Sequence, residues 1–168
     1  MELRAKILTV SDSVIDGRRH DEAGERLADR LSEAGYVVEE RSTVADGTES
    51  VANALREMAH GFSGLIVTTG GTGFSPRDLT PEGTVQVLDR EAPGLSEAMR
   101  SVNPLGRLSR ARAGTLGRSI VINTPGSPKG AIECLDAVLD VLAHALKLLA
   151  DESTDHPPDT GGTTATSS

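Results

Sequence analysis

Short apolar runs alternate with amphipathic segments through the first 150 residues, and this alternation limits the fold more than any other feature. Residues 5–10 and 64–69 are predicted strands because they are short, apolar and followed by polar or glycine-rich turns. Residues 21–34 and 48–60 carry apolar side chains at helical spacing. A further strand is predicted to open at 36–38 and another lies at 119–122, and further helices are predicted at 80–89, 94–100 and 131–149. This order predicts an α/β fold with three αβα layers and a central, mostly parallel sheet.

Residues 151–168 differ in composition from the rest of the chain. They read DESTDHPPDTGGTTATSS, which is polar, rich in proline and glycine, and without Lys or Arg. A segment of this kind cannot bury enough apolar surface to fold, so we expect a disordered acidic tail. Its four acidic residues carry half of the formal net charge of −8. We therefore expect one domain, residues 1–150, followed by the tail at 151–168.

Composition argues against several classes of protein. The chain is acidic and has one Tyr, two Phe and no Trp, so the basic stripe and aromatic platforms typical of nucleic-acid binding are missing. No apolar run approaches the roughly 18–20 residues that cross a bilayer, and the N-terminal MELRAKILTV does not resemble a signal peptide. The single cysteine, Cys134, cannot form an internal disulfide, as is typical of a reducing compartment. We expect a cytoplasmic protein that binds neither nucleic acid nor membrane.

Four polar clusters follow predicted strands, at residues 11–13, 46–47, 68–78 and 123–129. In a parallel sheet the carboxyl ends of the strands lie at one edge, and ligands of such sheets bind beyond that edge. The sequence therefore predicts that the four clusters converge on one active site.

The richest cluster is TTGGTGFSPRD, residues 68–78. The glycines within residues 70–73 allow backbone N–H groups to approach a ligand, and Thr69, Thr72 and Ser75 add hydroxyl donors. The cluster matches neither the dinucleotide-binding fingerprint nor the Walker loop. A tight turn that needs glycine for its geometry is the alternative, but this composition favours a cradle for phosphates or a heterocycle.

Two aspartates are candidate metal ligands, and each has a structural alternative. Asp78 precedes the helix start at Thr80-Pro81, where a carboxylate could hold Mg²⁺ or stabilise the helix dipole. Asp46 and Glu49 match a capping box, so the residues alone favour a helix cap for Asp46. Asp12, at a strand end, could bind a ligand or close a turn. No His or Cys spacing indicates a metal site.

Two further segments could bind anions. In PGSPKG, residues 125–130, Ser127 is the expected N-cap and Pro128 the first helical residue, which leaves N–H groups pointing outward. An ordinary capped turn explains the same pattern. Residues 100–118 hold five arginines and no acidic residue, without regular periodicity after residue 102. This excess suits a polyanionic ligand, a solvated face or a subunit contact, and Ser109-Arg110 is the pair we single out for binding.

Together these motifs resemble the Mog/MoaB family of molybdenum-cofactor biosynthesis proteins. The resemblance rests on ILTVSDS, GRRHDEAG, TTGGTGFSPRDLTPE, LSRARAG and INTPGSPKG, in the family's order across residues 4–149. It implies a molybdopterin-binding fold, commonly a trimer, and a nucleotidyltransferase that moves AMP from Mg²⁺-ATP to the terminal phosphate of molybdopterin. It also implies that Asp46 and Asp78 are catalytic and hold the metal, which reverses the residue-based interpretation of Asp46.

The resemblance extends to ligand contacts, with the 70–73 loop at the nucleotide and pterin and the 125–127 turn at the pterin. Together with the residues singled out above, the predicted ligand-binding set is Ser11, Asp12, Thr69, Gly70, Gly71, Thr72, Gly73, Ser75, Arg77, Ser109, Arg110, Pro125, Gly126 and Ser127. The alternative function is a noncatalytic molybdopterin-binding or scaffold protein of cofactor assembly. A molybdate-inserting protein is a candidate partner.

Overall fold

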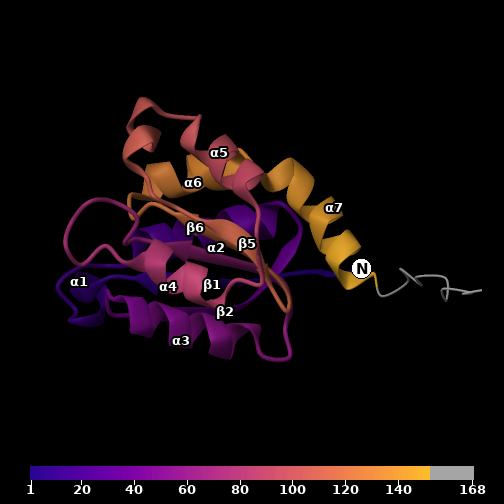
Figure 1. The fold of residues 1–168 in the computed structure, drawn as a ribbon, viewed down its shortest axis with the longest axis horizontal. Coiled ribbons are helices and arrows are strands. Elements are labelled where there is room, and N and C mark those ends of the chain that lie inside the picture. Colours follow the sequence, from indigo (N-terminus) through magenta and orange to yellow (C-terminus); the bar gives the residue numbers. More distant parts are fainter. Residues whose placement is uncertain (152–168) are drawn as a thin grey trace, which may run out of the picture.

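The computed structural model describes residues 1–151, which form a sheet with helices on both faces (Figure 1). The predicted tail lies outside the described residues except for Asp151. In chain order the elements are β1 (Leu3–Val10), α1 (Asp12–Ile15), α2 (Glu22–Glu33), β2 (Tyr36–Val44), α3 (Thr48–Ala59), β3 (Ser63–Thr69), α4 (Thr80–Val87), β4 (Arg90–Glu91), α5 (Pro93–Arg100), the 3₁₀ helix η1 (Pro104–Leu108), β5 (Ala113–Leu116), β6 (Arg118–Thr124), α6 (Pro128–Asp136) and α7 (Leu139–Ala150). Within residues 1–151, none of these helices is both long and apolar enough to cross a membrane.

Within the described residues the sheet has six strands in the order β2-β1-β3-β6-β5-β4. β1 pairs in parallel with β2 and β3, and β3 pairs in parallel with β6. β5 is antiparallel to β6, and β4 is antiparallel to β5. The prediction of a mostly parallel sheet is confirmed. Because four strands run in the same direction, their carboxyl ends meet at one edge.

The core has two parts, one on each face of the sheet, because successive strand side chains point to opposite faces. In β1, Ile7 belongs to the part covered by α2, α5, α6 and α7, and Leu8 belongs to the part covered by α3 and α4. Leu31, Leu142 and Leu55 are among the fully buried helix side chains. Burying each such side chain stabilises the fold by about 1.5–3 kcal/mol. The predicted three-layer αβα architecture is confirmed (Figure 1).

Local signals place several helix ends where the sequence predicts them. Asp21 is the N-cap of α2, and its carboxylate accepts the Gly24 N–H at 2.9 Å. Gly35 follows α2 with φ of +88°, a left-handed conformation that glycine adopts at little cost. Ser127 is the N-cap of α6, with its hydroxyl accepting the Gly130 N–H at 3.1 Å.

Two expectations about the secondary structure are wrong. The single helix predicted at 131–149 is two helices, because the Val138 N–H bonds to Leu135 only three residues back and the chain turns there. The strand predicted to open at 36–38 is confirmed as β2, which lies at the sheet edge and continues through polar residues to Val44. The segment 102–117, expected to be irregular, contains η1 and β5. The four residues of β5, AGTL, contain no apolar run that would predict a strand.

Candidate functional site

A polar cavity of about 180 Å³ opens at the carboxyl edge of the sheet. Each of the four predicted clusters contributes to its lining, through Ser11, Asp46, Thr69, Gly70, Gly71, Asp78 and Gly126. We call it the carboxylate cavity. The prediction that the four clusters converge is confirmed, because their strands run in parallel.

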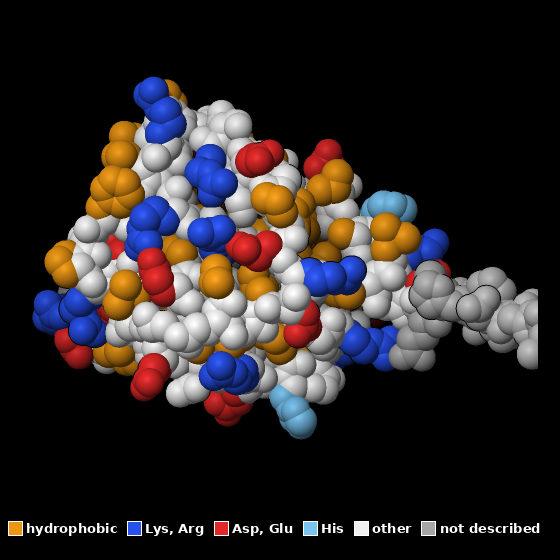
Figure 2. Space-filling model, in the orientation of Figure 1, with side chains coloured by type: hydrophobic (Ala, Val, Ile, Leu, Met, Phe, Trp, Pro, Cys, Tyr) orange, Lys and Arg blue, Asp and Glu red, His pale blue; other side chains and the backbone are white. Residues whose placement is uncertain are grey.

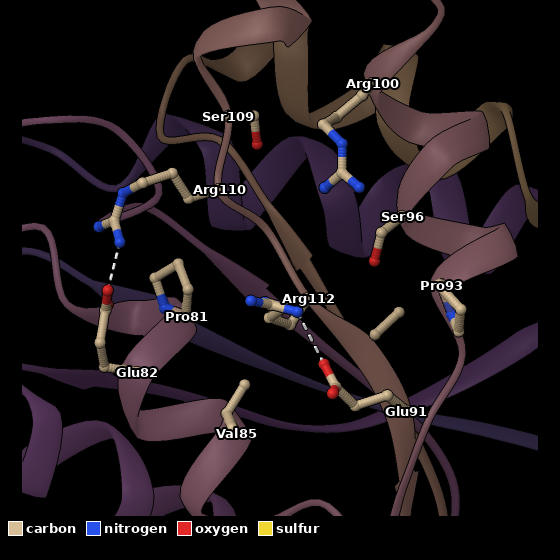
Figure 3. Close-up of a pocket in the computed structure, with 11 residues that line it drawn as sticks. Pro81, Glu82, Val85, Glu91, Pro93, Ser96, Arg100, Ser109, Arg110 and Arg112 are labelled. Carbon is tan, nitrogen blue, oxygen red and sulfur yellow. Dashed lines mark hydrogen bonds and ion pairs between the residues drawn. The ribbon is translucent and has the colours of Figure 1, made fainter.

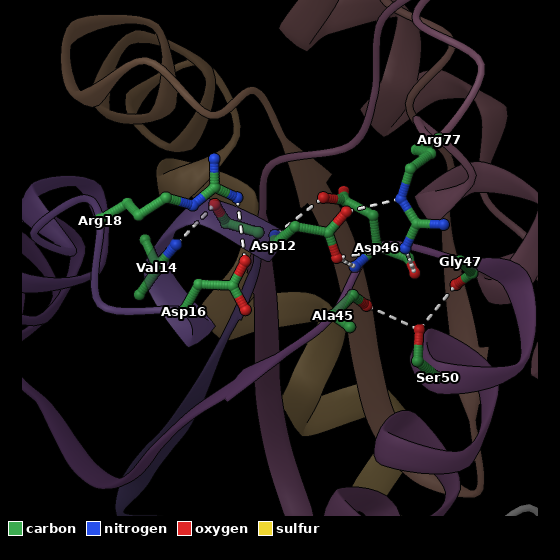
Figure 4. Close-up of polar contacts among 10 residues, drawn as sticks. Asp12, Val14, Asp16, Arg18, Ala45, Asp46, Gly47, Ser50 and Arg77 are labelled. Atoms are coloured by element: carbon green, nitrogen blue, oxygen red, sulfur yellow. Dashed lines mark hydrogen bonds and ion pairs between the residues drawn. The ribbon is translucent and has the colours of Figure 1, made fainter.

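Asp46 and Asp12 hold each other through reciprocal hydrogen bonds (Figure 4). The Asp12 backbone N–H donates to Asp46 Oδ2 at 2.9 Å, and the Asp46 N–H donates to Asp12 Oδ1 at 3.1 Å. The interpretation of Asp46 as the helix cap is wrong, because the N-cap of α3 is Gly47 and no side chain caps it. The Asp46 carboxylate faces the loop after β1, so local spacing along the chain could not reveal its role.

The charges around Asp46 favour a bound cation. Burial is the main cause that raises the pKa of Asp46, and the negative charges of Asp12 and Asp78 raise it further, against the hydrogen bond from the Asp12 N–H. The pKa of Asp12 is instead lowered, chiefly by hydrogen bonds from Arg77. A carboxylate whose negative form is opposed by neighbouring carboxylates gains stability when a cation binds beside it.

The glycines after β3 are required by the geometry of the loop. A Cβ on Gly70, whose φ is +100°, would lie 2.3 Å from the carbonyl oxygen of Val10. A Cβ on Gly71, whose φ is +68°, would lie 2.3 Å from Thr80 Oγ1 and 3.3 Å from Asp46 Oδ1. Side chains here would therefore strain the loop and crowd the carboxylate, which confirms that the turn needs glycine for its geometry. The ligand-cradle interpretation stays a prediction.

Asp78 lies at the end of the glycine-rich segment that follows β3. Its Oδ2 accepts the Ser75 N–H at 3.0 Å and lies 3.0 Å from the position of a Cβ on Gly73. It does not cap α4, whose N-cap residue is Leu79.

The donor set suits magnesium with a nucleotide better than a protein-enclosed metal. In Asp46 and in Asp78, Oδ2 accepts one of the hydrogen bonds given above, which leaves Oδ1 of each carboxylate for a cation. Among residues 1–151, no group of three or more His, Cys, Asp or Glu side chains is arranged to hold a metal. Mg²⁺ commonly uses one or two protein carboxylates together with substrate phosphates and water. Asp46 and Asp78 fit that pattern.

A larger cavity of about 530 Å³ lies across the PGSP turn. Pro125 and Ser127 line it, whereas Gly126 between them lines the carboxylate cavity. Its other lining residues include Met99, Val102, Asn103, Leu105, Ser109, Lys129 and Cys134. We call it the apolar cavity. Burial raises the pKa of the Cys134 thiol to about 11, so this thiol is neutral near pH 7.

The arginines predicted to bind ligand make bonds within the protein. Arg77 binds Asp12 and donates to the Asp46 carbonyl oxygen at 2.9 Å (Figure 4). Arg110 pairs with Glu82 and donates to the carbonyl oxygens of Gly73 at 2.9 Å and Asp78 at 2.5 Å. These arginines therefore hold the loops that carry the two aspartates.

Basic side chains gather over the face that carries α5 and η1 (Figure 2). A depression of about 640 Å³ lies there. Figure 3 shows its lining, with Arg110 paired to Glu82 and Arg112 paired to Glu91. Arg100 lines the same depression and donates to the Ala111 carbonyl oxygen at 2.9 Å. Most of this arginine-rich segment is thus separate from the carboxylate cavity.

The sequence prediction missed one wall of the carboxylate cavity. Residues 19–23 line it, and Asp21 accepts the Thr9 hydroxyl at 2.9 Å and an Arg41 N–H at 3.2 Å. The GRRHDEAG motif at 17–24 is the signal that could have found this wall, but the predicted ligand-binding set includes none of its residues. Nine residues of that set lie outside the lining of the carboxylate cavity. Three of them, Ser109, Pro125 and Ser127, line the apolar cavity. The other six line neither cavity, namely Asp12, Thr72, Gly73, Ser75, Arg77 and Arg110.

Comparison with known proteins assigns the family. Residues 6–144 match the family described as the probable molybdopterin binding domain. The chain is 36% identical over 152 residues to the molybdopterin adenylyltransferase of Helicobacter pylori (strain J99), with 85% of each chain covered. It is 37% identical over 138 residues to the molybdenum cofactor biosynthesis protein B of Bacillus cereus, covering 78% of this chain and 80% of that protein.

A solved structure shows the same fold. The crystal structure of the molybdopterin biosynthesis enzyme MoaB from Thermus thermophilus matches with a TM-score of 0.82 and 45% identity, over 88% of this chain and 96% of that one. These matches extend across the sheet and both cavities, and they confirm the family expected from the sequence motifs. The chain therefore belongs to the molybdopterin-binding domain family of molybdenum-cofactor biosynthesis proteins.

Proposed function

We propose that the protein is a molybdopterin adenylyltransferase, which transfers AMP from Mg²⁺-ATP to the terminal phosphate of molybdopterin and releases pyrophosphate. One observation carries this proposal: Asp46 and Asp78 line a single cavity against the glycine loop, at the edge where parallel sheets bind ligands. The Helicobacter pylori relative, which is 36% identical to this chain, is named molybdopterin adenylyltransferase.

The residues of the cavity would act by positioning and charge. Asp46 and Asp78 would hold the Mg²⁺ that arrives with ATP, and this ion would neutralise charge on the triphosphate and the leaving pyrophosphate. Gly71 and Gly73 would offer backbone N–H groups to a phosphate without side chains of their own, whereas the Gly70 N–H already donates to the Thr124 carbonyl oxygen at 3.1 Å. The molybdopterin phosphate is itself the nucleophile, so no protein nucleophile takes part.

The two cavities suggest how the substrates divide. The pterin suits the apolar cavity, where Ser109 and Ser127 supply hydroxyl groups beside Met99 and Leu105. Its phosphate would reach the carboxylate cavity past Gly126, where a Cβ would lie 3.4 Å from Gly70 Cα. The 70–73 loop and the PGSP turn thus form a narrow boundary, at which the molybdopterin phosphate would meet the nucleotide.

The second candidate function is a noncatalytic molybdopterin-binding or scaffold protein of cofactor assembly. It is favoured by the similarity to relatives named only as molybdenum cofactor biosynthesis protein B. The two aspartates favour the enzyme, because pterin binding alone does not need a second carboxylate whose negative charge raises the pKa of Asp46.

The resemblance to this family also supports a proposal for the compartment, the oligomeric state and the partner of the enzyme. We propose that it works in the cytoplasm as a homotrimer and passes adenylylated molybdopterin to a molybdate-inserting protein. The neutral free thiol of Cys134 fits a reducing compartment.

Anaerobic incubation with molybdopterin and Mg²⁺-ATP tests the proposal, with adenylylated pterin and pyrophosphate followed together. Product from the wild-type protein that needs Mg²⁺ would support the enzyme. Tight pterin binding without product would instead establish the binding or scaffold function.

A further inference from the structure

Two arginines each reach the backbone of one of the paired aspartates. Arg77 Nη2 donates to the Asp46 carbonyl oxygen at 2.9 Å, and Arg110 Nη2 donates to the Asp78 carbonyl oxygen at 2.5 Å. Neither hydrogen bond is a local contact within one helix or strand. Arg77 spans 31 residues to Asp46, and Arg110 spans 32 residues to Asp78. The two aspartates are thus held by equivalent contacts from other segments.

Each arginine is itself held by a carboxylate. Asp12 accepts from Arg77 Nε at 2.5 Å and from Nη2 at 3.1 Å, and Asp12 also exchanges two hydrogen bonds with Asp46. Glu82, in the first turn of α4, binds Arg110 Nη1, while Arg110 Nε donates to the Gly73 carbonyl oxygen. Each guanidinium therefore links a carboxylate to the loop that carries an aspartate.

We propose that Arg77 and Arg110 are positioning residues, which fix the backbone of Asp46 and Asp78 for metal binding instead of binding substrate phosphate themselves. This inference rests on the proposed function and differs from the ligand-binding role that the sequence suggests for both arginines. A guanidinium group presents its N–H donors in a rigid, planar arrangement. In both arginines these donors bind carboxylate and carbonyl oxygens of the protein itself.

Exposure and charge support this role. The Arg77 side chain is 64% exposed and its Asp12 partner 30% exposed, and such surface pairs add little stability. The pairs therefore matter chiefly for where the aspartates lie. The internal carboxylates also cancel the arginine charges, so each arginine would have to leave its partner before it could attract a phosphate.

The Arg110–Glu82 pair gives a test in which the two roles predict opposite results. Glu82 contacts Arg110 but is not bonded to Asp78. If Arg110 bound phosphate, Glu82→Ala would free its charge and tighten nucleotide binding. If Arg110 positions Asp78, Glu82→Ala and Arg110→Gln both release the Asp78 loop and weaken metal binding together.

The experiment measures Mn²⁺ affinity by electron paramagnetic resonance with α,β-methylene ATP present, and kcat and KM for ATP alongside. We expect Arg77→Gln, Arg110→Gln and Glu82→Ala each to weaken Mn²⁺ binding and lower kcat by about 10–100-fold, the usual effect of losing a residue that orients a metal ligand. The matched control is Arg112→Gln, which removes an arginine of the same segment that pairs only with exposed Glu91. It should leave both values unchanged.

Several results would overturn the proposal. Tighter or unchanged Mn²⁺-nucleotide binding in Glu82→Ala is one, and a rise in KM for ATP with unchanged kcat in Arg110→Gln is another. Thermal unfolding checks each variant. If Arg110→Gln does not fold, Arg110→Lys keeps the charge without the fork, so retained Mn²⁺ affinity there would contradict positioning. A wild-type protein that forms no adenylylated pterin would reject the proposed function, while the Mn²⁺ measurements would still decide the role of the arginines.

Discussion

The carboxylate cavity and the apolar cavity share the PGSP turn but differ in construction. The first has a volume of about 180 Å³ and is built from strand ends and loops joined by hydrogen bonds such as those between Asp12 and Asp46. The second has about 530 Å³ and is lined by side chains of α5, η1 and α6, with Leu105 72% exposed. This difference supports the proposed division, in which phosphates bind where the backbone is tightly held and the pterin ring binds among apolar side chains that are open to solvent.

The largest expected effect is a loss of turnover without a loss of pterin binding when an aspartate of the carboxylate cavity is replaced. Asp46→Asn or Asp78→Asn should lower kcat by on the order of 10²–10³-fold, as does the loss of a group that stabilises transition-state charge. Pterin affinity should stay near the wild-type value, because the apolar cavity does not include either aspartate. Turnover assays and equilibrium binding of molybdopterin measure the two quantities. An active Asp78→Asn variant would refute the metal role.

The second effect tests the boundary between the cavities. Gly70→Ala should lower the free energy of unfolding by on the order of 1–3 kcal/mol, because its positive φ and a contact of 2.3 Å with the Val10 carbonyl oxygen both oppose a side chain. Gly126→Ala is the matched control, since its Cβ would make an ordinary contact at 3.4 Å. Chemical denaturation measures both variants. Equal destabilisation would show that the Gly70 geometry is not limiting.

The third effect concerns the apolar cavity alone. Leu105→Ala should weaken molybdopterin binding roughly tenfold through lost apolar contact, because each buried methylene contributes about 0.8 kcal/mol. The fold should be little affected, since Leu105 is largely exposed. Mn²⁺ affinity should not change. A comparable loss of Mn²⁺ affinity would show that the two cavities do not act separately.

The smallest effect follows from the thiol in the apolar cavity. Because the pKa of Cys134 is raised by burial from 9.0 to about 11, its alkylation by iodoacetamide should keep accelerating up to about pH 11. The folded protein holds this proton more tightly than the unfolded chain does. The thiol therefore contributes stability below pH 9 that is lost as the pH rises towards 11. A rate that levels off near pH 9, followed by mass spectrometry, would contradict this burial.

Several parts of the site were predictable because their signals are local. Periodicity identified the strands that end at residues 10, 69 and 124, and the parallel sheet then implied one edge for the four polar clusters. Ser127 followed from its place before Pro128, because an N-cap interacts only with the next few residues. The wrong cap interpretation of Asp46 has the same origin, since a capping-box pattern does not reveal a partner 34 residues away.

The sequence by itself determined the α/β class, the carboxyl edge as the place of the site and, through its motifs, the family. Only the tertiary structure decided that Arg77 and Arg110 hold the aspartate loops, that residues 19–23 form a wall, and that the PGSP turn separates two cavities. The physical reason is range. Strand and helix patterns arise from neighbours along the chain, whereas the direction of a guanidinium depends on which distant carbonyl and carboxylate oxygens the folded sheet brings within reach.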